Sequence, residues 1–122
     1  MEQTKYHYSA KIIDIHDGDT LRADIDLGFG VVLKNQTFRF FGINAPEIYG
    51  DTKTAGMKTT TYVQETLADK EVIIMSLKDE KEKFGRWLGR IYYRNGEDWI
   101  NLNQELIDKG LAVKFMDDGK EI

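Results

Sequence analysis

The feature that most constrains this fold is a set of short strand-like segments interrupted by a single stretch of helical period. The clearest strand signal spans residues 20–27, where apolar and polar residues alternate without a break. Every second position there is apolar: Leu21, Ala23, Ile25 and Leu27. Because successive side chains of a strand point to opposite faces, this alternation predicts a strand with one face in the core.

Four further segments are predicted to be strands because they are rich in β-branched and aromatic residues: 6–15, 31–42, 71–77 and 87–94. Turn sequences separate several of these segments. Gly28-Phe29-Gly30 breaks the chain after the alternating strand, and the pair Asn95-Gly96 closes the last one.

Residues 52–68 follow a helical period instead. One predicted helical face collects Ala55, Thr59, Tyr62, Val63, Thr66 and Leu67, while Gly56 weakens the first turn. A second helix is predicted to begin after the cap Asn101, with Gln104 in the capping-box position, and to end at Gly110. Its buried stripe is predicted to contain Leu102, Leu106 and Ile107.

Five strands with a helix between the third and the fourth are the pattern of one small barrel architecture. We therefore predict an α+β, mainly β fold, a five-stranded OB-type Greek-key barrel with two helices. The 122 residues are one domain's worth of chain, so residues 1–122 are predicted to form a single domain, and we expect a monomer.

Composition excludes several classes of protein. The chain has no cysteine, which excludes disulfides and zinc-thiolate sites. No apolar run approaches the roughly 20 residues that a membrane span requires, so no membrane partner is expected. The polar N-terminus is no secretory signal, so the sequence as written predicts a cytoplasmic protein, or a secreted one if a signal was removed.

The charge balance counts against a nucleic-acid partner without excluding one. The net charge is −4 and the pI about 5.2, whereas nucleic-acid binders usually carry a basic footprint. A local basic patch is sufficient on an acidic molecule, and a cation site itself requires acidic residues.

Four short segments contain residues that could take part in catalysis or binding: 17–20 (DGDT), Arg39, 44–47 (NAPE) and 84–86 (FGR). Taken singly, each has a plain structural explanation. Asp-Gly is a common hairpin turn, Pro46 favours an extended loop, and charged residues usually lie on solvated faces. His16, at the end of a strand, is better explained as a polar strand-end residue than as a base.

Asp19 and Arg39 are not fully covered by these explanations. Asp19 shares the parity of Leu21, so its carboxylate is predicted to lie on the core side at the barrel rim, where it requires a partner such as a cation. Arg39 lies between Phe38 and Phe40 in an otherwise apolar stretch. An arginine there is costly unless it reaches a partner or a ligand.

The residue types fit phosphate chemistry beside a hard cation. Carboxylate, amide and main-chain carbonyl oxygens are the ligands that calcium prefers, and two arginines offer forked donors to a phosphate. Glu47 is a candidate base for orienting or deprotonating water. Two histidines are too few for a zinc cluster, and an EF-hand loop beginning at Asp14 fails because its last ligand position is Ile25.

In combination and order, these motifs resemble the staphylococcal nuclease family. The resemblance runs from about Ile12 to Ala112. It rests on IHDGDT at 15–20, TFRFFGINAPE at 37–47, KFGR at 83–86 and the segment 102–112. It implies a calcium-dependent endonuclease that hydrolyses phosphodiester bonds of DNA or RNA and releases a 5′-hydroxyl end.

The resemblance also implies a role for each matching residue. Asp19 matches the calcium-ligating aspartate, and Ala45 matches the residue whose main-chain carbonyl binds calcium. Glu47 matches the glutamate that positions or activates the attacking water. Arg39 and Arg86 match the two arginines that hold the phosphate and stabilise its extra charge.

The substrate contacts and the second metal ligand differ from the family pattern. Phe84 lies where members often have a tyrosine near the nucleotide base, and Lys83 beside it is a further candidate substrate contact. Asn44 stands where the best-known members have a second calcium aspartate, so the site keeps an oxygen donor but loses a negative charge. The chain ends soon after Phe115, so the third helix of longer members is expected to be absent.

The alternative is a non-catalytic OB-fold module that binds nucleic acid or protein. Asn44 and the acidic balance favour this module, whereas Arg39, Glu47 and Arg86 together favour the enzyme. A structural protein with a family-like barrel explains none of the polar residues in apolar contexts, although fold alone does not imply function.

Overall fold

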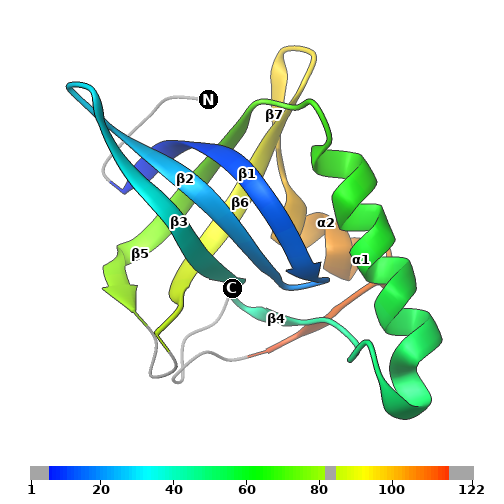
Figure 1. The fold of residues 1–122 in the computed structure, drawn as a ribbon. Coiled ribbons are helices and arrows are strands. Elements are labelled where there is room, and N and C mark those ends of the chain that lie inside the picture. The colour runs from blue at the N-terminus through cyan, green and yellow to red at the C-terminus, as the bar shows by residue number, and fades with distance from the viewer. Residues whose placement is uncertain (1–5, 82–84, 116–122) are drawn as a thin grey trace.

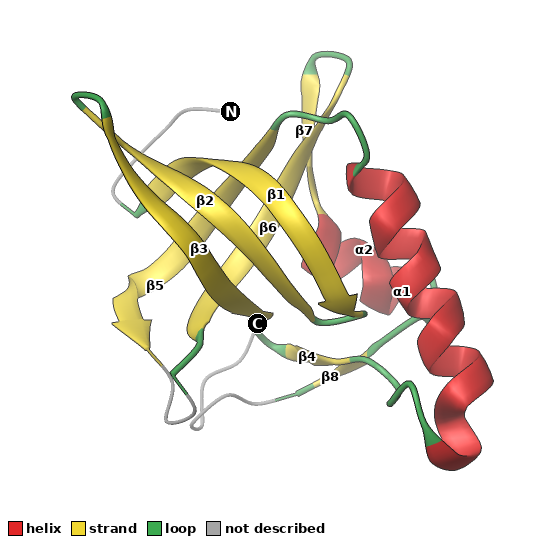
Figure 2. Cartoon of the chain, viewed as in Figure 1, coloured by secondary structure: helices red, strands yellow, loops and turns green. Residues whose placement is uncertain are grey.

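The structure is a computed structural model that describes residues 6–81 and 85–115. Five strands build the barrel: β1 (His7–Asp17), β2 (Thr20–Gly28), β3 (Val31–Phe40), β5 (Val72–Lys81) and β6 (Trp87–Asn95). The remaining elements are β4 (Ile43–Asn44), η1 (Gly50–Thr52), α1 (Lys53–Leu67), β7 (Asp98–Asn101), α2 (Leu102–Asp108) and β8 (Val113–Lys114). Figure 2 shows that strands dominate the fold and that the two helices lie outside the barrel.

The sheet runs in the order β3-β2-β1-β5-β6-β7 and closes on itself through a pairing of β3 with β6. That closing pair is parallel and short, joining Phe38–Phe40 to Trp87–Gly89, whereas the other neighbours are antiparallel. The predicted five-stranded barrel with two helices is therefore confirmed. In Figure 1, α1 runs along one side of the barrel, and β4 and β8 lie together at one end.

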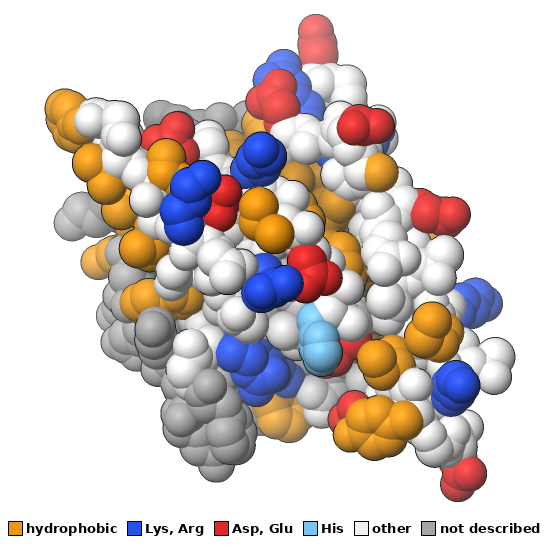
Figure 3. Space-filling view, in the orientation of Figure 1, with side chains coloured by type: hydrophobic (Ala, Val, Ile, Leu, Met, Phe, Trp, Pro, Cys, Tyr) orange, Lys and Arg blue, Asp and Glu red, His pale blue; other side chains and the backbone are white. Residues whose placement is uncertain are grey.

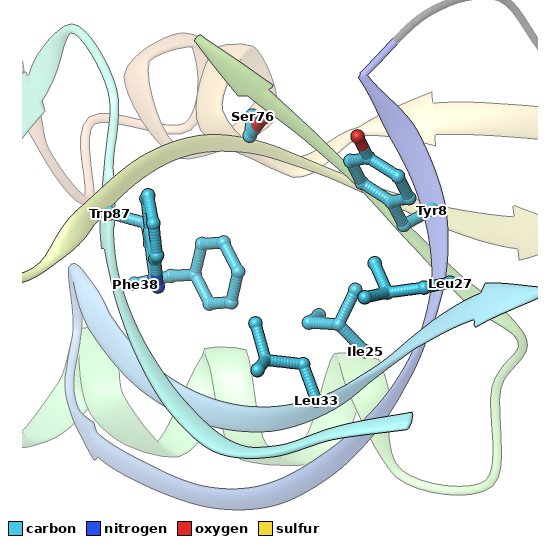
Figure 4. Close-up of a pocket in the computed structure, with 7 residues that line it drawn as sticks. All are labelled: Tyr8, Ile25, Leu27, Leu33, Phe38, Ser76 and Trp87. Carbon is cyan, nitrogen blue, oxygen red and sulfur yellow. The ribbon is translucent and has the colours of Figure 1, made fainter. Parts of the chain in front are cut away.

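The alternation predicted in β2 holds along most of the strand. Leu21, Ala23 and Ile25 are almost fully buried inside the barrel. Leu27 departs from the prediction because it is 43% exposed, near the tip of the β2–β3 hairpin. There it lines an apolar hollow of about 180 Å³ that opens into the barrel, at the end where β1 and β3 begin (Figure 4). The hollow is lined by Tyr8, Ile25, Leu27, Leu33, Phe38, Ser76 and Trp87.

Helix α1 packs on the barrel through a face that differs slightly from the predicted one. Its buried residues are Gly56, Thr59, Thr60, Val63 and Leu67. The prediction was wrong for Ala55, which is exposed. Gly56 takes the buried place because the chain at Pro46 approaches the helix closely: a Cβ at residue 56 would lie 2.7 Å from the Pro46 carbonyl oxygen.

Helix α2 begins as predicted and is fixed to the barrel by buried polar bonds. The Asn101 side chain accepts a hydrogen bond from the Gln104 backbone N–H at 3.2 Å. The buried Asn103 accepts from the Ile91 N–H at 3.0 Å and donates to the carbonyls of Phe41 at 2.9 Å and Gly89 at 3.1 Å. These bonds tie α2 to β6 and to the chain that leaves β3, which carries the candidate site.

Within the described residues, no helix is both long enough and apolar enough to cross a membrane.

Candidate active site

Four of the predicted site residues, Asp19, Arg39, Asn44 and Ala45, lie at the end of the barrel where β1 turns into β2 and β3 runs on into β4 (Figure 1). The register pairs Thr20 with Arg39, which brings the start of β2 beside the end of β3. The Phe40 backbone N–H donates to the Asp19 carbonyl at 2.8 Å and extends this pairing by one step. Residues about 20 positions apart in the sequence therefore share one site.

The turn between β1 and β2 is packed tightly against its neighbours. A Cβ at Gly18 would lie 2.6 Å from Thr59 Cγ2 of α1 and 2.8 Å from Ala45 Cβ. The turn thus requires glycine for close approach, and it presses the Asp19 loop between the helix and the chain after β4. The Asp-Gly signal marks a real turn, and the turn also carries the site.

Asp19 is half-buried, as its parity predicted, and has specific donors. Its Oδ2 accepts from the Ala45 backbone N–H at 2.9 Å, and its Oδ1 accepts from Thr20 Oγ1 at 3.2 Å. Burial raises the pKa of Asp19 to about 6, with Asp17 adding to the rise, although the Ala45 N–H and Arg39 oppose it. The environment therefore penalises the charged carboxylate, and a bound cation would relieve this penalty.

Arg39 is 8% exposed and has the partners that its apolar context predicted. Its Nη2 donates to the Ile43 carbonyl at 2.9 Å and to Asn44 Oδ1 at 2.7 Å, and its Nη1 donates to the Phe40 carbonyl at 3.2 Å. The Phe115 ring stacks on the guanidinium, 4.9 Å from Cζ to the ring centroid. The group is thereby held in one orientation at the junction of β3 and β4.

Asn44 and Ala45 connect Arg39 to Asp19. Asn44 ends β4, and its amide oxygen accepts the Arg39 bond, while the next backbone N–H, that of Ala45, donates to Asp19. The structure therefore joins Asp19, Arg39, Asn44 and Ala45 in one hydrogen-bonded network. This network brings together the three predicted metal ligands and one of the two predicted phosphate-binding arginines.

Glu47 lies in the loop after Pro46 and is exposed to solvent. Its backbone is fixed rather than its carboxylate: the Glu47 carbonyl accepts from Thr52 Oγ1 at 2.9 Å, and Gly56 of α1 packs directly against it. The helix N-terminal region thus positions the loop and leaves the side chain accessible to a substrate.

Arg86 lies just before β6 and is half-buried. It lines a hollow on the outer face of the barrel together with Thr20, whose hydroxyl bonds to Asp19. The structure therefore places Arg86 beside the network through this shared hollow. Phe84 and Lys83, the two predicted substrate contacts, lie outside the described residues.

Among the described residues, no three His, Cys, Asp or Glu side chains are grouped so as to hold a metal ion. A cation at this site would depend on one well-placed carboxylate and on neutral oxygens. Asp19 would supply the carboxylate, while Asn44 and Ala45 would supply an amide and a carbonyl oxygen of the type that calcium accepts. The chemical types of these donors fit calcium, although they carry fewer negative charges than a site that binds calcium tightly.

Two residues of the site were not predicted from the sequence. Asp17 accepts from the Asp19 backbone N–H at 3.2 Å and contributes to the raised pKa of Asp19. Phe115 covers Arg39, and its own N–H donates to the Gly42 carbonyl at 2.8 Å. The DGDT motif contained a signal for Asp17, whereas nothing in the sequence pattern connects residue 115 with residue 39.

The barrel and the site network define a small OB-type barrel protein with a polar site at one end. Comparison with known families identifies the family to which the chain belongs. A family model described as staphylococcal nuclease homologue matches residues 37–121, well over half of the chain. The chain therefore belongs to the staphylococcal nuclease family.

Two curated relatives illustrate the range of the similarity. An uncharacterized protein of Methanocaldococcus jannaschii is 30% identical over 134 residues, covering 93% of this chain and 62% of the relative. A thermonuclease of Staphylococcus hyicus is 28% identical over 109 residues, covering 86% of this chain and 59% of that enzyme. The chain thus spans about three fifths of the length of these relatives.

Proposed function

We propose that this protein is a calcium-dependent endonuclease that hydrolyses phosphodiester bonds of DNA, RNA or both. The observation that carries the proposal is the hydrogen-bonded network of Asp19, Ala45, Asn44 and Arg39 at one end of the barrel. A half-buried carboxylate beside a fixed guanidinium fits a site that binds a cation and an anion together. Family membership and the similarity to a thermonuclease support the same activity.

Arg39 and Arg86 are proposed to hold the reacting phosphate. The Phe115 ring stacks on one face of the Arg39 guanidinium and helps to hold it in place beside Asn44. Because Arg39 is buried, its charge acts in a medium of low dielectric constant, where it stabilises added negative charge on phosphorus more strongly than in water.

Glu47 is proposed to act as the general base. It accepts a proton from a water molecule whose oxygen attacks phosphorus. The bond from phosphorus to the 5′ oxygen then breaks, and the leaving oxygen takes up a proton to become the 5′-hydroxyl. The exposed position of Glu47 on a loop fixed by Thr52 and Gly56 supports this role, because the carboxylate is accessible while its backbone is held.

Calcium is proposed to be held by Asp19, Asn44 and the Ala45 carbonyl. When bound, it would polarise the phosphate and neutralise part of its charge. Asn44 shares its oxygen with Arg39, and an amide contributes no charge, so the affinity for calcium is expected to be low.

A non-catalytic module that binds nucleic acid is the second candidate. The bond from Arg39 to Asn44 favours it, because this bond occupies two proposed functional groups with one another. The two candidates differ in one respect that experiment can measure: only the enzyme needs the basicity of Glu47.

The experiment compares Glu47→Gln with Glu65→Gln, a control on the exposed surface of α1. Glutamine keeps the size and hydrogen bonding of Glu47 but cannot accept the proton. We expect Glu47→Gln to lower the maximal rate of single-stranded DNA cleavage by about 100-fold or more, with oligonucleotide binding unchanged and the control active. Weakened binding at an unchanged maximal rate would instead make Glu47 a ligand-holding residue.

A further inference from the structure

The polar hollow that Arg86 lines lies on the outer face of the barrel, next to the site network. It has a volume of about 400 Å³ and is lined by Asp14, His16, Thr20, Arg22, Thr37 and Arg86. In Figure 3, which views the β1–β3 face, Lys and Arg side chains are spread over this surface with acidic side chains between them and a histidine nearby. The acidic net charge of the chain therefore does not extend evenly over this face.

Strand register explains why these side chains meet. Asp14 of β1 pairs with Arg22 of β2, and Arg22 in turn pairs with Thr37 of β3. The β3–β6 pairing of Phe38 with Trp87 then brings Arg86 alongside Thr37. The result is one row of side chains that crosses β1, β2 and β3 and ends at Arg86, just before β6.

Arg39 belongs to the next row of the same face. It follows Thr37 by two residues on β3 and pairs with Thr20. Arg22 is therefore a diagonal cross-strand neighbour of Arg39, and such positions lie roughly 7–8 Å apart at the backbone. Such a spacing suits successive phosphates of one extended nucleic-acid strand.

The hollow has donors suited to a phosphate and a counterion that can be displaced. Arg22 donates to Asp14 Oδ2 from Nη2 at 2.7 Å and from Nε at 3.1 Å. The side chains of this pair are 42% and 41% exposed, so the ion pair is worth little and exchanges easily. A phosphate that replaced Asp14 would meet Arg22, with Thr37 beside it on the neighbouring strand.

We propose that this hollow binds a backbone phosphate of the substrate strand, next to the phosphate that is cleaved. The proposal rests on the proposed nuclease function and adds the path of the strand, which crosses the outer face of β1, β2 and β3. Arg22 is then a substrate-binding residue, and Asp14 acts as an intramolecular competitor of the phosphate.

The plain alternative is that Asp14 and Arg22 form a cross-strand ion pair that only stabilises the sheet. The two explanations predict different effects on oligonucleotide binding when Asp14 or Arg22 is neutralised. A stabilising pair loses the same interaction whichever partner is removed. A phosphate subsite weakens when Arg22 is neutralised but strengthens when Asp14 is neutralised, because the competing carboxylate is gone.

The test measures binding of a labelled single-stranded oligonucleotide of about 12 nucleotides, and of a dinucleotide, by fluorescence anisotropy in chelator. The variants are Arg22→Gln and Asp14→Asn. A matched control is another exposed ion pair, Arg94 with Glu71 at 3.8 Å, through Arg94→Gln and Glu71→Gln. We expect Arg22→Gln to weaken oligonucleotide binding about tenfold and to lower the salt slope by about one, and Asp14→Asn to tighten binding. Dinucleotide binding and the control pair should not change.

Equal effects of Asp14→Asn and Arg22→Gln on binding, or effects no larger than those of the control pair, would overturn the proposal. Because binding is measured without cleavage, absence of nuclease activity in the wild type would contradict the proposed function alone.

Discussion

At the scale of single residues, sequence parity predicted the position of Asp19 and local context predicted a partner for Arg39. Both predictions are confirmed: Asp19 is half-buried with a raised pKa, and Arg39 bonds to three acceptors. The identity of those acceptors was not predictable. Two are backbone carbonyls at a chain reversal, and the ring that covers Arg39 belongs to Phe115, far along the chain.

Because Arg39 is more buried than Arg86, the two alanine variants are expected to differ in their free energy of unfolding. Arg39→Ala leaves the carbonyls of Phe40 and Ile43 without their buried donor, which costs about 1–3 kcal/mol for each unsatisfied group. Arg86 is half-buried in an open hollow, so Arg86→Ala is expected to change the free energy of unfolding by less than about 1 kcal/mol.

Both variants should lower the cleavage rate by about 100-fold or more. Denaturant unfolding and initial rates, with Arg94→Ala as the control, check the two effects. Equal stabilities of Arg39→Ala and Arg86→Ala would show that the buried bonds of Arg39 do not support the fold. Near-wild-type rates in both folded variants would remove the arginines from the phosphate site.

At the scale of elements, the long periodic segments were predictable and the short ones were not. Strand β2 follows from alternation, the other four barrel strands from their β-branched and aromatic residues, and the helices from helical period and the Asn101 cap. Strands β4 and β8 have two residues each, too few for any period, and they are defined by pairing with one another. The error at Ala55 has a similar cause, because the approach of the Pro46 loop decides the buried face.

That approach makes Gly56 a sensitive position of α1. Gly56→Ala should favour the isolated helix by about 1 kcal/mol, because alanine has the higher helix propensity. In the folded protein the added methyl meets the carbonyls of Pro46 and Glu47, so we expect a net loss of about 1–3 kcal/mol of stability and a lower cleavage rate as the Glu47 loop moves.

The neighbouring Ala55→Gly is the matched control, because Ala55 is exposed on the same turn. It should cost about 1 kcal/mol of stability through helix propensity and leave the cleavage rate unchanged. Thermal unfolding and initial rates of the two variants test this. A stabilised and fully active Gly56→Ala protein would mean that the loop accommodates the methyl group and that its position does not matter for cleavage.

At the scale of the whole molecule, the barrel that β3 and β6 close has two ends of different polarity. One end holds the polar network of Asp19 and Arg39, and the other opens into the apolar hollow lined by Leu27 and Leu33. The acidic net charge is compatible with a polyanionic substrate only if cations gather locally. The outer face beside the network holds Arg22 and Arg86, with Asp14 paired to Arg22.

The central claim, calcium-dependent hydrolysis, is tested most directly by cleavage of an end-labelled single-stranded DNA by the purified protein over a calcium titration. We expect cleavage to rise with calcium and to saturate only at high concentration, because Asp19 is the one well-placed carboxylate among the proposed ligands. Excess chelator should stop the reaction, and added calcium should restore it. Undiminished cleavage in excess chelator would contradict the proposed metal dependence, and intact DNA at every calcium concentration, with binding retained, would contradict the enzyme.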